Sequence, residues 1–189
     1  MGRSKDTYLA ENTALGIRGY LGLQILDPLD PYDLAGRLSV RVIKSNEIPG
    51  ISPAVIKHAL GQGKDDWSAG TIVLPGGNHL IILNPMHSRL RRKSTLMEEI
   101  CHVVLGHNPS HLGNRDDSLW FRSYDKDAEA EAYRVGAAAL IPYDGLRELL
   151  QEGLDIIHIG KRYDVTRNLV EYRLKVNGLW KMHQRLADQ

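Results

Sequence analysis

The apolar residues of the first forty positions recur mostly at helical spacing. Over 8–26 they form a rough stripe, and this stretch is predicted to be a helix although three glycines interrupt it. Pro31 suits the first position of a second helix that runs through Leu38. The run 40–43, rich in valine and isoleucine, then predicts a short strand.

Beyond Gly70 the period changes to that of β-structure. Two runs rich in β-branched residues, 71–74 and 79–83, lie on either side of the turn sequence Pro-Gly-Gly-Asn at 75–78. Short apolar runs separated by such a turn are typical of a hairpin. The pattern therefore predicts a β-hairpin over 71–83.

The rest of the chain returns to helical spacing. A helix is predicted over 95–107, and a loop then runs through Asp125. An alanine-rich helix over about 127–141 is stopped by Pro142. Shorter helices are predicted at 53–60, 146–151, 155–161 and 166–176, with Gly178 near the final stop.

This order of elements predicts an α+β fold that is mainly helical, with a small antiparallel β-sheet and a C-terminal helical region. No internal repeat or low-complexity linker divides the chain. We therefore expect a single domain over 1–189, with its core at about 27–145 and the C-terminal helices at about 146–180.

Composition and charge narrow the class of protein without naming a function. Hydrophobic residues make up 42% and charged residues 25% of the 189 residues, as in ordinary globular proteins. The 24 Lys and Arg nearly cancel the 23 Asp and Glu, so the charge gives no reason to expect nucleic acid as a partner. One cysteine, no N-terminal apolar run and no apolar stretch of ~18 residues predict a cytoplasmic protein without a membrane segment.

Candidate chemistry lies in the predicted helix 95–107. Glu98 and His102 are four residues apart, so on a helix they lie about 40° from each other around the axis and can converge on one ion. In His-Glu-x-x-His metallopeptidases two histidines at this spacing bind zinc, and the intervening Glu activates water. Here Glu98 replaces the first histidine, and Glu99 stands at the position of the base. A non-metal interpretation is also open, because Thr95 and Glu98 fit a capping box and His102 could be a core histidine.

A second segment supports the metal interpretation, because the acidic start of 129–142 could offer a third ligand from a facing helix. Together the two segments resemble the ImmA/IrrE family of metallopeptidases. Members of that family show a His-Glu-x-x-His helix that often continues to Leu-Gly-His, as at 105–107 here, and then an acidic, alanine-rich helix ending in Leu-Met-Pro. The early Asp30-Pro31 helix start, the hairpin within 67–84 and the C-terminal pattern over 163–179 also resemble the family.

The resemblance implies a zincin-like fold and assigns roles position by position. It makes Glu98, His102 and Glu129 the metal ligands and Glu99 the catalytic base. Glu131 is the fallback third ligand, since it lies about 200° from Glu129 around the helix and only one of the two can face the metal. The implied cofactor is zinc, or manganese as another divalent metal. The implied reaction is hydrolysis of a peptide bond by metal-activated water, in a repressor-like regulator cleaved in stress response or mobile-element induction.

Two departures from the family pattern keep other functions open. With Glu98 in place of the first histidine, the predicted ligand set has one histidine and two carboxylates, so it is richer in oxygen ligands and more negative. Tyr133 stands where the family usually has Asn or Asp. A catalytically impaired pseudo-peptidase that acts by binding a protein is therefore an alternative to an atypical zinc metallopeptidase. A DNA-binding regulator is another, with basic residues on the C-terminal helices at Arg162, Arg167, Arg173 and Lys175.

Overall fold

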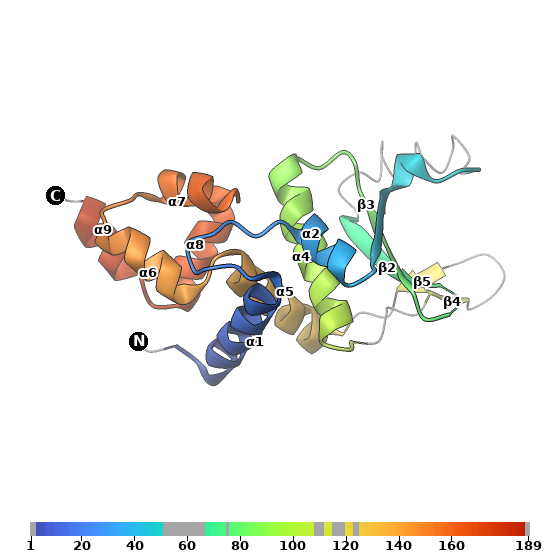
Figure 1. The fold of residues 1–189 in the computed structure, drawn as a ribbon, viewed down its shortest axis with the longest axis horizontal. Coiled ribbons are helices and arrows are strands. Elements are labelled where there is room, and N and C mark those ends of the chain that lie inside the picture. Colours follow the sequence, from blue (N-terminus) through green and yellow to red (C-terminus); the bar gives the residue numbers. More distant parts are fainter. Residues whose placement is uncertain are drawn as a thin grey trace. The chain divides into compact units, whose positions relative to one another are not determined.

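The computed structural model describes residues 3–50, 67–74, 76–107, 112–114, 120–122 and 125–187 (Figure 1). The helix predicted at 53–60 lies outside these residues. The chain divides into two compact units. We call Pro31–Tyr133 the sheet unit, and Met1–Asp30 together with Arg134–Gln189 the helical unit. The assignment of 1–189 to a single domain stays a prediction.

The sheet unit is built around three strands, β1 (Arg41–Lys44), β2 (Ala69–Val73) and β3 (His79–Leu83), in the order β1-β3-β2. β2 and β3 pair antiparallel with Thr71 opposite Ile81, which confirms the predicted hairpin. β1 pairs with β3 in parallel, so the sheet is mixed and not purely antiparallel. Within this three-stranded sheet of described residues, β2 is therefore an edge strand.

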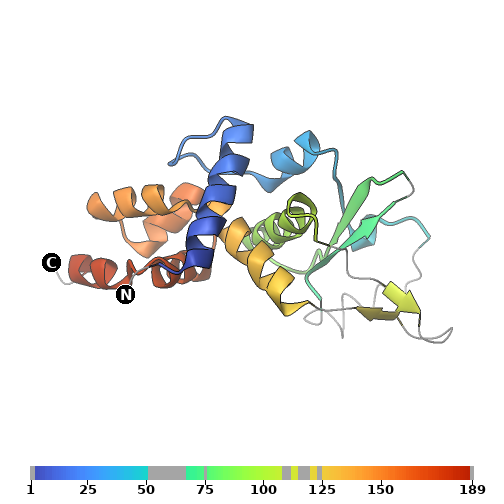
Figure 2. The ribbon, with the colours of Figure 1, turned by 90° about the horizontal axis from the view of Figure 1, so that it is seen from below.

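Helix α4 (Arg89–Val104) packs against the sheet and against α2 (Pro31–Arg37). Figure 2 shows α4, in yellow-green, beside the arrows of β2 and β3. Its buried stripe includes Leu96, Met97 and Ile100, which are completely buried. Burial of this apolar stripe against the sheet is the main force that fixes α4 in place.

The start of α4 corrects the sequence prediction. The helix begins at Arg89, where Ser88 is the N-cap and its side chain accepts a hydrogen bond from the backbone N of Arg91 at 3.3 Å. The predicted start at Thr95 is wrong, because the basic residues before it form the first turns of the helix. That run carries too few apolar residues to show a helical stripe in the sequence.

The segment between α4 and α5 (Lys126–Leu140) was predicted to be a loop, and it contains two short strands. β4 (Leu112–Asn114) and β5 (Trp120–Arg122) pair antiparallel. Strands of three residues are too short to show a reliable alternation of apolar and polar positions, so the sequence did not predict them. α5 itself begins and ends within one residue of its predicted bounds.

The helical unit contains α1 (Lys5–Leu21), the second half of α5, α6 (Tyr143–Gln151), α7 (Ile156–Tyr163), α8 (Arg167–Val176) and α9 (Trp180–Ala187). α1 ends earlier than predicted, because Gly22 adopts a left-handed φ of 72° and closes the helix. Gly178 follows α8 but does not end the helical region, so the predicted final stop is wrong and α9 follows. The described residues thus form the predicted α+β fold, mainly helical.

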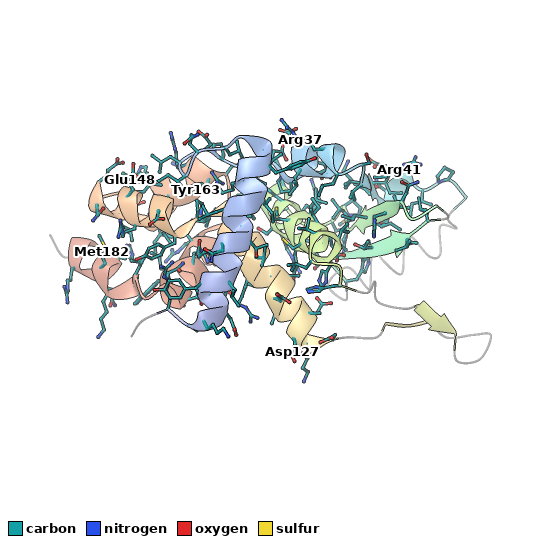
Figure 3. The ribbon with its side chains drawn as sticks, turned by 60° about the horizontal axis from the view of Figure 1, so that its bottom comes forward. Arg37, Arg41, Asp127, Glu148, Tyr163 and Met182 are labelled. Carbon is teal, nitrogen blue, oxygen red and sulfur yellow. The ribbon has the colours of Figure 1, made fainter. Side chains whose placement is uncertain are left out.

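Polar side chains are also enclosed in the helical unit. Arg173 and Glu11 form an ion pair and are 1% and 5% exposed. Tyr163, labelled in Figure 3, donates from its hydroxyl to the backbone O of Ile25 at 2.8 Å. Among the described residues, no helix has the length and apolar character needed to cross a membrane.

Candidate metal centre

The predicted ligand Glu98 and the predicted ligand His102 lie in the interior of α4, one turn apart. Since the N-cap of this helix is Ser88, Thr95 and Glu98 are not at a helix start, and the capping-box interpretation is wrong. Glu98 is half-buried, as is His102. The helical spacing that places both side chains on one face is therefore present as predicted.

His102 and Glu129 approach each other from two helices. Nε2 of His102 is 3.6 Å from Oε2 of Glu129, which lies in the first turn of α5. This separation is longer than a normal hydrogen bond. It is close to the spacing of two ligands of one tetrahedral zinc ion, about 3.4 Å for bonds of about 2.1 Å. The structure thus brings two of the three predicted ligands together.

His107 and Glu131 extend this pair on the other side of His102. Nδ1 of His107 is 3.0 Å from Nδ1 of His102, and Nε2 of His107 is 3.2 Å from Oε2 of Glu131. We call these four side chains, His102, His107, Glu129 and Glu131, the His–Glu cluster. Glu129 and Glu131 each face a different histidine.

A glycine turn explains why His107 reaches His102. On a continuous helix, residues five apart differ by about 140° around the axis and point away from each other. Gly106 has a φ of 67°, and the backbone N of His107 donates to the backbone O of His102 at 2.9 Å. This is the Schellman-type closure of a helix, which turns the chain back over its last turn. The sequence Leu-Gly-His thereby folds His107 beside His102.

Glu99, the predicted catalytic base, is held by the sheet. Glu99 is 7% exposed, and the hydroxyl of Thr71 donates to its Oε2 at 2.6 Å. Thr71 lies on the edge strand β2. Sequence reasoning missed Thr71, because nothing local marks a threonine of a hairpin as a partner of a helix 28 positions later. Glu99 is thus tied directly to the edge of the sheet.

Cys101 has no catalytic environment. It is completely buried between the positions of the predicted base and ligand on α4. Burial raises the pKa of its thiol far above the ordinary value, and the nearby Glu98 carboxylate raises it further. The thiol therefore stays protonated, and Cys101 acts as a small packing residue.

The third predicted ligand is not gathered with the other two. Within the described ranges, no group of three or more His, Cys, Asp or Glu side chains is arranged to hold a metal ion. His102 and Glu129 nevertheless form a donor pair of the kind that zinc and manganese use, an imidazole nitrogen and a carboxylate oxygen. Glu98, one helical turn before His102, would have to turn toward this pair to complete the predicted set.

The four basic residues considered for DNA binding make contacts inside the helical unit. Arg173 pairs with Glu11, Arg167 pairs with Glu171 at 2.7 Å, Arg162 donates to the backbone O of Leu26 at 3.1 Å, and Lys175 lies over the Trp180 ring. A buried arginine cannot reach a phosphate group. Of the four, only Arg173 is buried; Arg162, Arg167 and Lys175 are exposed, and DNA binding stays a prediction.

The fold is α+β and mainly helical, and the comparison with known families supports a metallopeptidase-like function. Residues 37–175 match the family model Peptidase_M78, described as the IrrE N-terminal-like domain, and the chain belongs to this family. The resemblance found in the sequence is thereby confirmed. Proteins of this family are typically zinc-dependent peptidases. No curated protein matches the chain in a sequence search.

A solved structure of a Mycobacterium tuberculosis transcriptional regulator is similar to this chain. It matches with a TM-score of 0.52 at 15% sequence identity, over 96% of this chain and 50% of that one. The chain therefore spans about half the length of the structure it matches. At this identity the likeness shows a shared fold.

Proposed function

We propose that this protein is a metal-dependent peptidase, in which Glu98, His102 and Glu129 hold a divalent ion and Glu99 is the general base. The observation that supports it most is the approach of His102 Nε2 to Glu129 Oε2, at 3.6 Å, on the helix that carries Glu99. A bound zinc or manganese ion would acidify a water molecule and polarise the peptide carbonyl. The chain's own residues supply the remaining steps.

Glu99 takes a proton from the attacking water and passes it to the leaving amine. For this it needs one carboxylate oxygen directed at the water. The hydroxyl of Thr71 donates to Oε2, so this hydrogen bond holds one oxygen of the carboxylate against the edge strand. The hydrogen bond also fixes the plane of the carboxylate, since a buried carboxylate with a donated hydrogen bond has little freedom to rotate.

The edge strand β2 binds the substrate. A peptide in extended conformation can add to a sheet edge through backbone hydrogen bonds, and its side chains then alternate between the two faces. Thr71 lies on this edge and contacts Glu99. A peptide added to β2 would therefore run past the base, and this favours an extended, locally unfolded segment as the substrate.

The substrate class that we infer is a regulatory protein of the repressor type, cleaved in stress response or during induction of a mobile element. The family resemblance supports a protein substrate. The Mycobacterium tuberculosis protein of similar fold is a transcriptional regulator, which fits a role of such domains in gene regulation. A cytoplasmic location follows for a protease of such regulators.

The first test is elemental analysis of untagged protein after incubation with zinc or manganese, for the native chain, His102→Ala and Glu129→Ala. We expect near-stoichiometric metal in the native protein and loss of it in both variants. The metal-loaded native protein should then cleave unstructured test proteins such as casein, with Glu99→Gln slower by about 10²–10⁴-fold. Metal binding that is unchanged in both ligand variants would contradict the proposal.

A second candidate is a pseudo-peptidase that works by binding a partner protein. The observation that favours it is that His102, Glu129 and Glu98 do not form a three-residue group among the described residues. The variant Glu98→His separates the two candidates, because it restores the His-Glu-x-x-His pattern. For a pseudo-peptidase we expect no metal in the native chain and zinc binding in Glu98→His. For a peptidase we expect metal in both.

A further inference from the structure

We propose that α7 (Ile156–Tyr163) and α8 (Arg167–Val176) form a helix-turn-helix that binds duplex DNA, with α8 lying in the major groove. Both helices belong to the helical unit, whereas the His–Glu cluster belongs to the sheet unit. The inference therefore goes beyond the proposed function and does not depend on a bound metal.

The turn between the two helices has the geometry of this motif. α7 ends at Tyr163 and α8 begins at Arg167, and DNA-binding helix pairs are joined by turns of about three to four residues. Asp164 ends α7 with a left-handed φ of 55°. Thr166 then caps α8, because its hydroxyl accepts a hydrogen bond from the backbone N of Leu169 at 3.3 Å. Local hydrogen bonds thus define the end of one helix and the start of the next.

Close packing holds α8 in place against α7 (Figure 1). A Cβ added at Gly160 would lie 3.2 Å from the backbone O of Val165 and 3.8 Å from Cγ2 of Val170. A larger residue at this position would therefore push the turn away from α7. The apolar residues of the pair are buried, namely Ile156, Ile159, Tyr163, Val165, Leu169, Val170 and Leu174.

The opposite face of α8 is polar. Arg167, Asn168 and Lys175 are exposed on it, and they lie within about 140° around the helix axis. Arginine and asparagine pair with guanine and adenine in the major groove, and lysine contacts phosphates. This face lacks the large aliphatic side chains of a protein–protein interface, from whose centre lysine is depleted. It therefore suits DNA better than a protein partner.

Positive charge is concentrated in this part of the chain. Residues 155–187 contain seven of the 24 Lys and Arg but only three of the 23 Asp and Glu. Lys161 and Arg162 are exposed in the last turn of α7, next to the turn that leads to α8. A helix about 10–12 Å across fits a major groove about 12 Å wide, and basic residues beside it can neutralise phosphates. The near-zero charge of the whole chain hides this local surplus.

Glu171 limits the affinity of this face for DNA. Arg167 Nε lies 2.7 Å from Glu171 Oε1, and the two side chains are 68% and 23% exposed. An exposed ion pair contributes little, so Arg167 can exchange the carboxylate for a phosphate. The carboxylate itself repels phosphates, and its removal should strengthen binding to DNA of any sequence.

The first experiment is fluorescence anisotropy of a labelled DNA duplex of mixed sequence, about 20 base pairs long, with the full metal-free chain. For three or four phosphate contacts we expect binding to weaken about 40–150-fold between about 50 and 200 mM salt. Lys175→Gln should weaken binding and lower the salt slope by about 1. Lys5→Gln, which removes an exposed charge from α1 of the same unit, should change neither. No binding by the native chain, or equal effects of the two variants, would overturn the inference.

Glu171→Gln gives a test that loss of folding cannot imitate, because binding should become tighter. The variant removes the repulsive carboxylate and releases Arg167 from its ion pair. Glu152→Gln is the control, since it removes an exposed carboxylate at the end of α6. We expect several-fold tighter binding in Glu171→Gln alone. An affinity equal to that of the native chain would contradict the placement of α8 against DNA.

An RNA duplex of the same sequence separates groove binding from general attraction to phosphates. The major groove of A-form RNA is too deep and narrow to admit a helix, although its backbone is as highly charged. We expect the DNA duplex to bind at least about 10-fold more tightly than the RNA duplex. Equal affinities would rule out the major groove as the site of α8.

DNA binding and the proposed peptidase activity can fail independently. Glu99→Gln should bind the DNA duplex as the native chain does, because Glu99 lies in the sheet unit. DNA binding by a chain that holds no metal would support this inference and contradict the proposed function. Metal binding and casein cleavage by a chain without affinity for DNA would do the reverse. If both hold, the peptidase is placed on the DNA where a repressor-type substrate is bound.

Discussion

The helical unit and the sheet unit each contain a group of charged side chains, and the two groups differ in what surrounds them. In the helical unit, Glu11 and Arg173 are almost completely buried and pair with each other. The remaining bonding capacity is used by backbone, since Arg173 Nε donates to Ile141 O at 2.9 Å and Glu11 Oε2 accepts from Tyr143 N at 3.1 Å. This group is complete within the protein.

The His–Glu cluster of the sheet unit lies closer to solvent. Its side chains are partly exposed, and His102 Nε2 lies 3.6 Å from Glu129 Oε2, beyond hydrogen-bond distance. A fully buried, paired group contributes to one stable conformation, whereas a partly exposed group of histidines and carboxylates can bind a ligand. The comparison predicts that changes in the first group affect stability and changes in the second affect binding and activity.

The largest expected effect on stability is that of Arg173→Met. It leaves the buried carboxylate of Glu11 without its charged partner, so we expect the free energy of unfolding to fall by about 3–5 kcal/mol. Urea unfolding followed by circular dichroism measures it. Metal content, taken under native conditions, should stay as in the unchanged chain.

The double variant Glu11→Leu, Arg173→Met is the control, because it removes both charges. It should lose much less stability than Arg173→Met alone, since no unpaired charge remains in the core. A double variant as unstable as the single one would show that packing of the arginine, and not its charge, holds the helical unit together.

The next largest expected effect is a loss of stability at alkaline pH, which acts on the helical unit through Tyr163. Burial raises the pKa of Tyr163 from about 10 to about 12. Between these values the unfolded chain has lost the phenol proton that the folded protein keeps. The free energy of unfolding should therefore be constant up to about pH 10 and then fall, by about 2–3 kcal/mol when pH has passed 12.

Urea unfolding between pH 8 and 12 measures this dependence, and Tyr163→Phe is its control. The variant should be less stable at neutral pH, because the bond to Ile25 O is lost. It should also lose most of the alkaline decline. A decline of equal size in Tyr163→Phe would assign the effect to other groups.

Thr71→Val tests the sheet unit through the hydrogen bond that Thr71 donates to Glu99. Valine keeps the shape and strand preference of threonine but cannot donate to Glu99 Oε2. We expect kcat for casein cleavage by the metal-loaded protein to fall about 10-fold, with the free energy of unfolding changed by less than about 1.5 kcal/mol. Thr71→Ser keeps the hydroxyl and should retain more activity. Equal losses in both variants would rule out the hydrogen bond as the cause.

The sequence predicted those features of the molecule that depend on local pattern. The two β-rich runs and the turn sequence between them predicted the hairpin over 71–83, and the spacing of Glu98 and His102 placed both on one face of α4. The start of α4 was missed because the basic run before Thr95 carries too few apolar residues to show a helical stripe.

Long-range contacts explain the rest of what the sequence did not predict. No local pattern shows that Thr71 reaches Glu99, or that Glu129 and Glu131 face two different histidines, because these contacts depend on how strand and helices pack. The Leu-Gly-His motif was visible as part of the family resemblance. Its effect, a turn that folds His107 back beside His102, became evident only from the left-handed φ of Gly106.

Gly106→Ala has the smallest expected effect on stability. It compares the two units directly, because Gly22 of the helical unit offers a matched site. An added Cβ at Gly106 meets no atom within 4 Å, so the only strain is that of alanine at a φ of 67°. We expect a loss of about 1 kcal/mol in the free energy of unfolding.

Gly22 of the helical unit is the matched site, with a φ of 72° at the end of α1 and equally open space around its Cβ position. Gly22→Ala should lose about the same stability. Only Gly106→Ala should change the imidazole NMR signals of His102, because only that glycine sets the position of His107. If both variants left His102 unchanged, the helix-ending turn would be ruled out as the feature that builds the His–Glu cluster. A change in Gly106→Ala alone would mean that this turn, at little cost in stability, prepares His102 for its ligand.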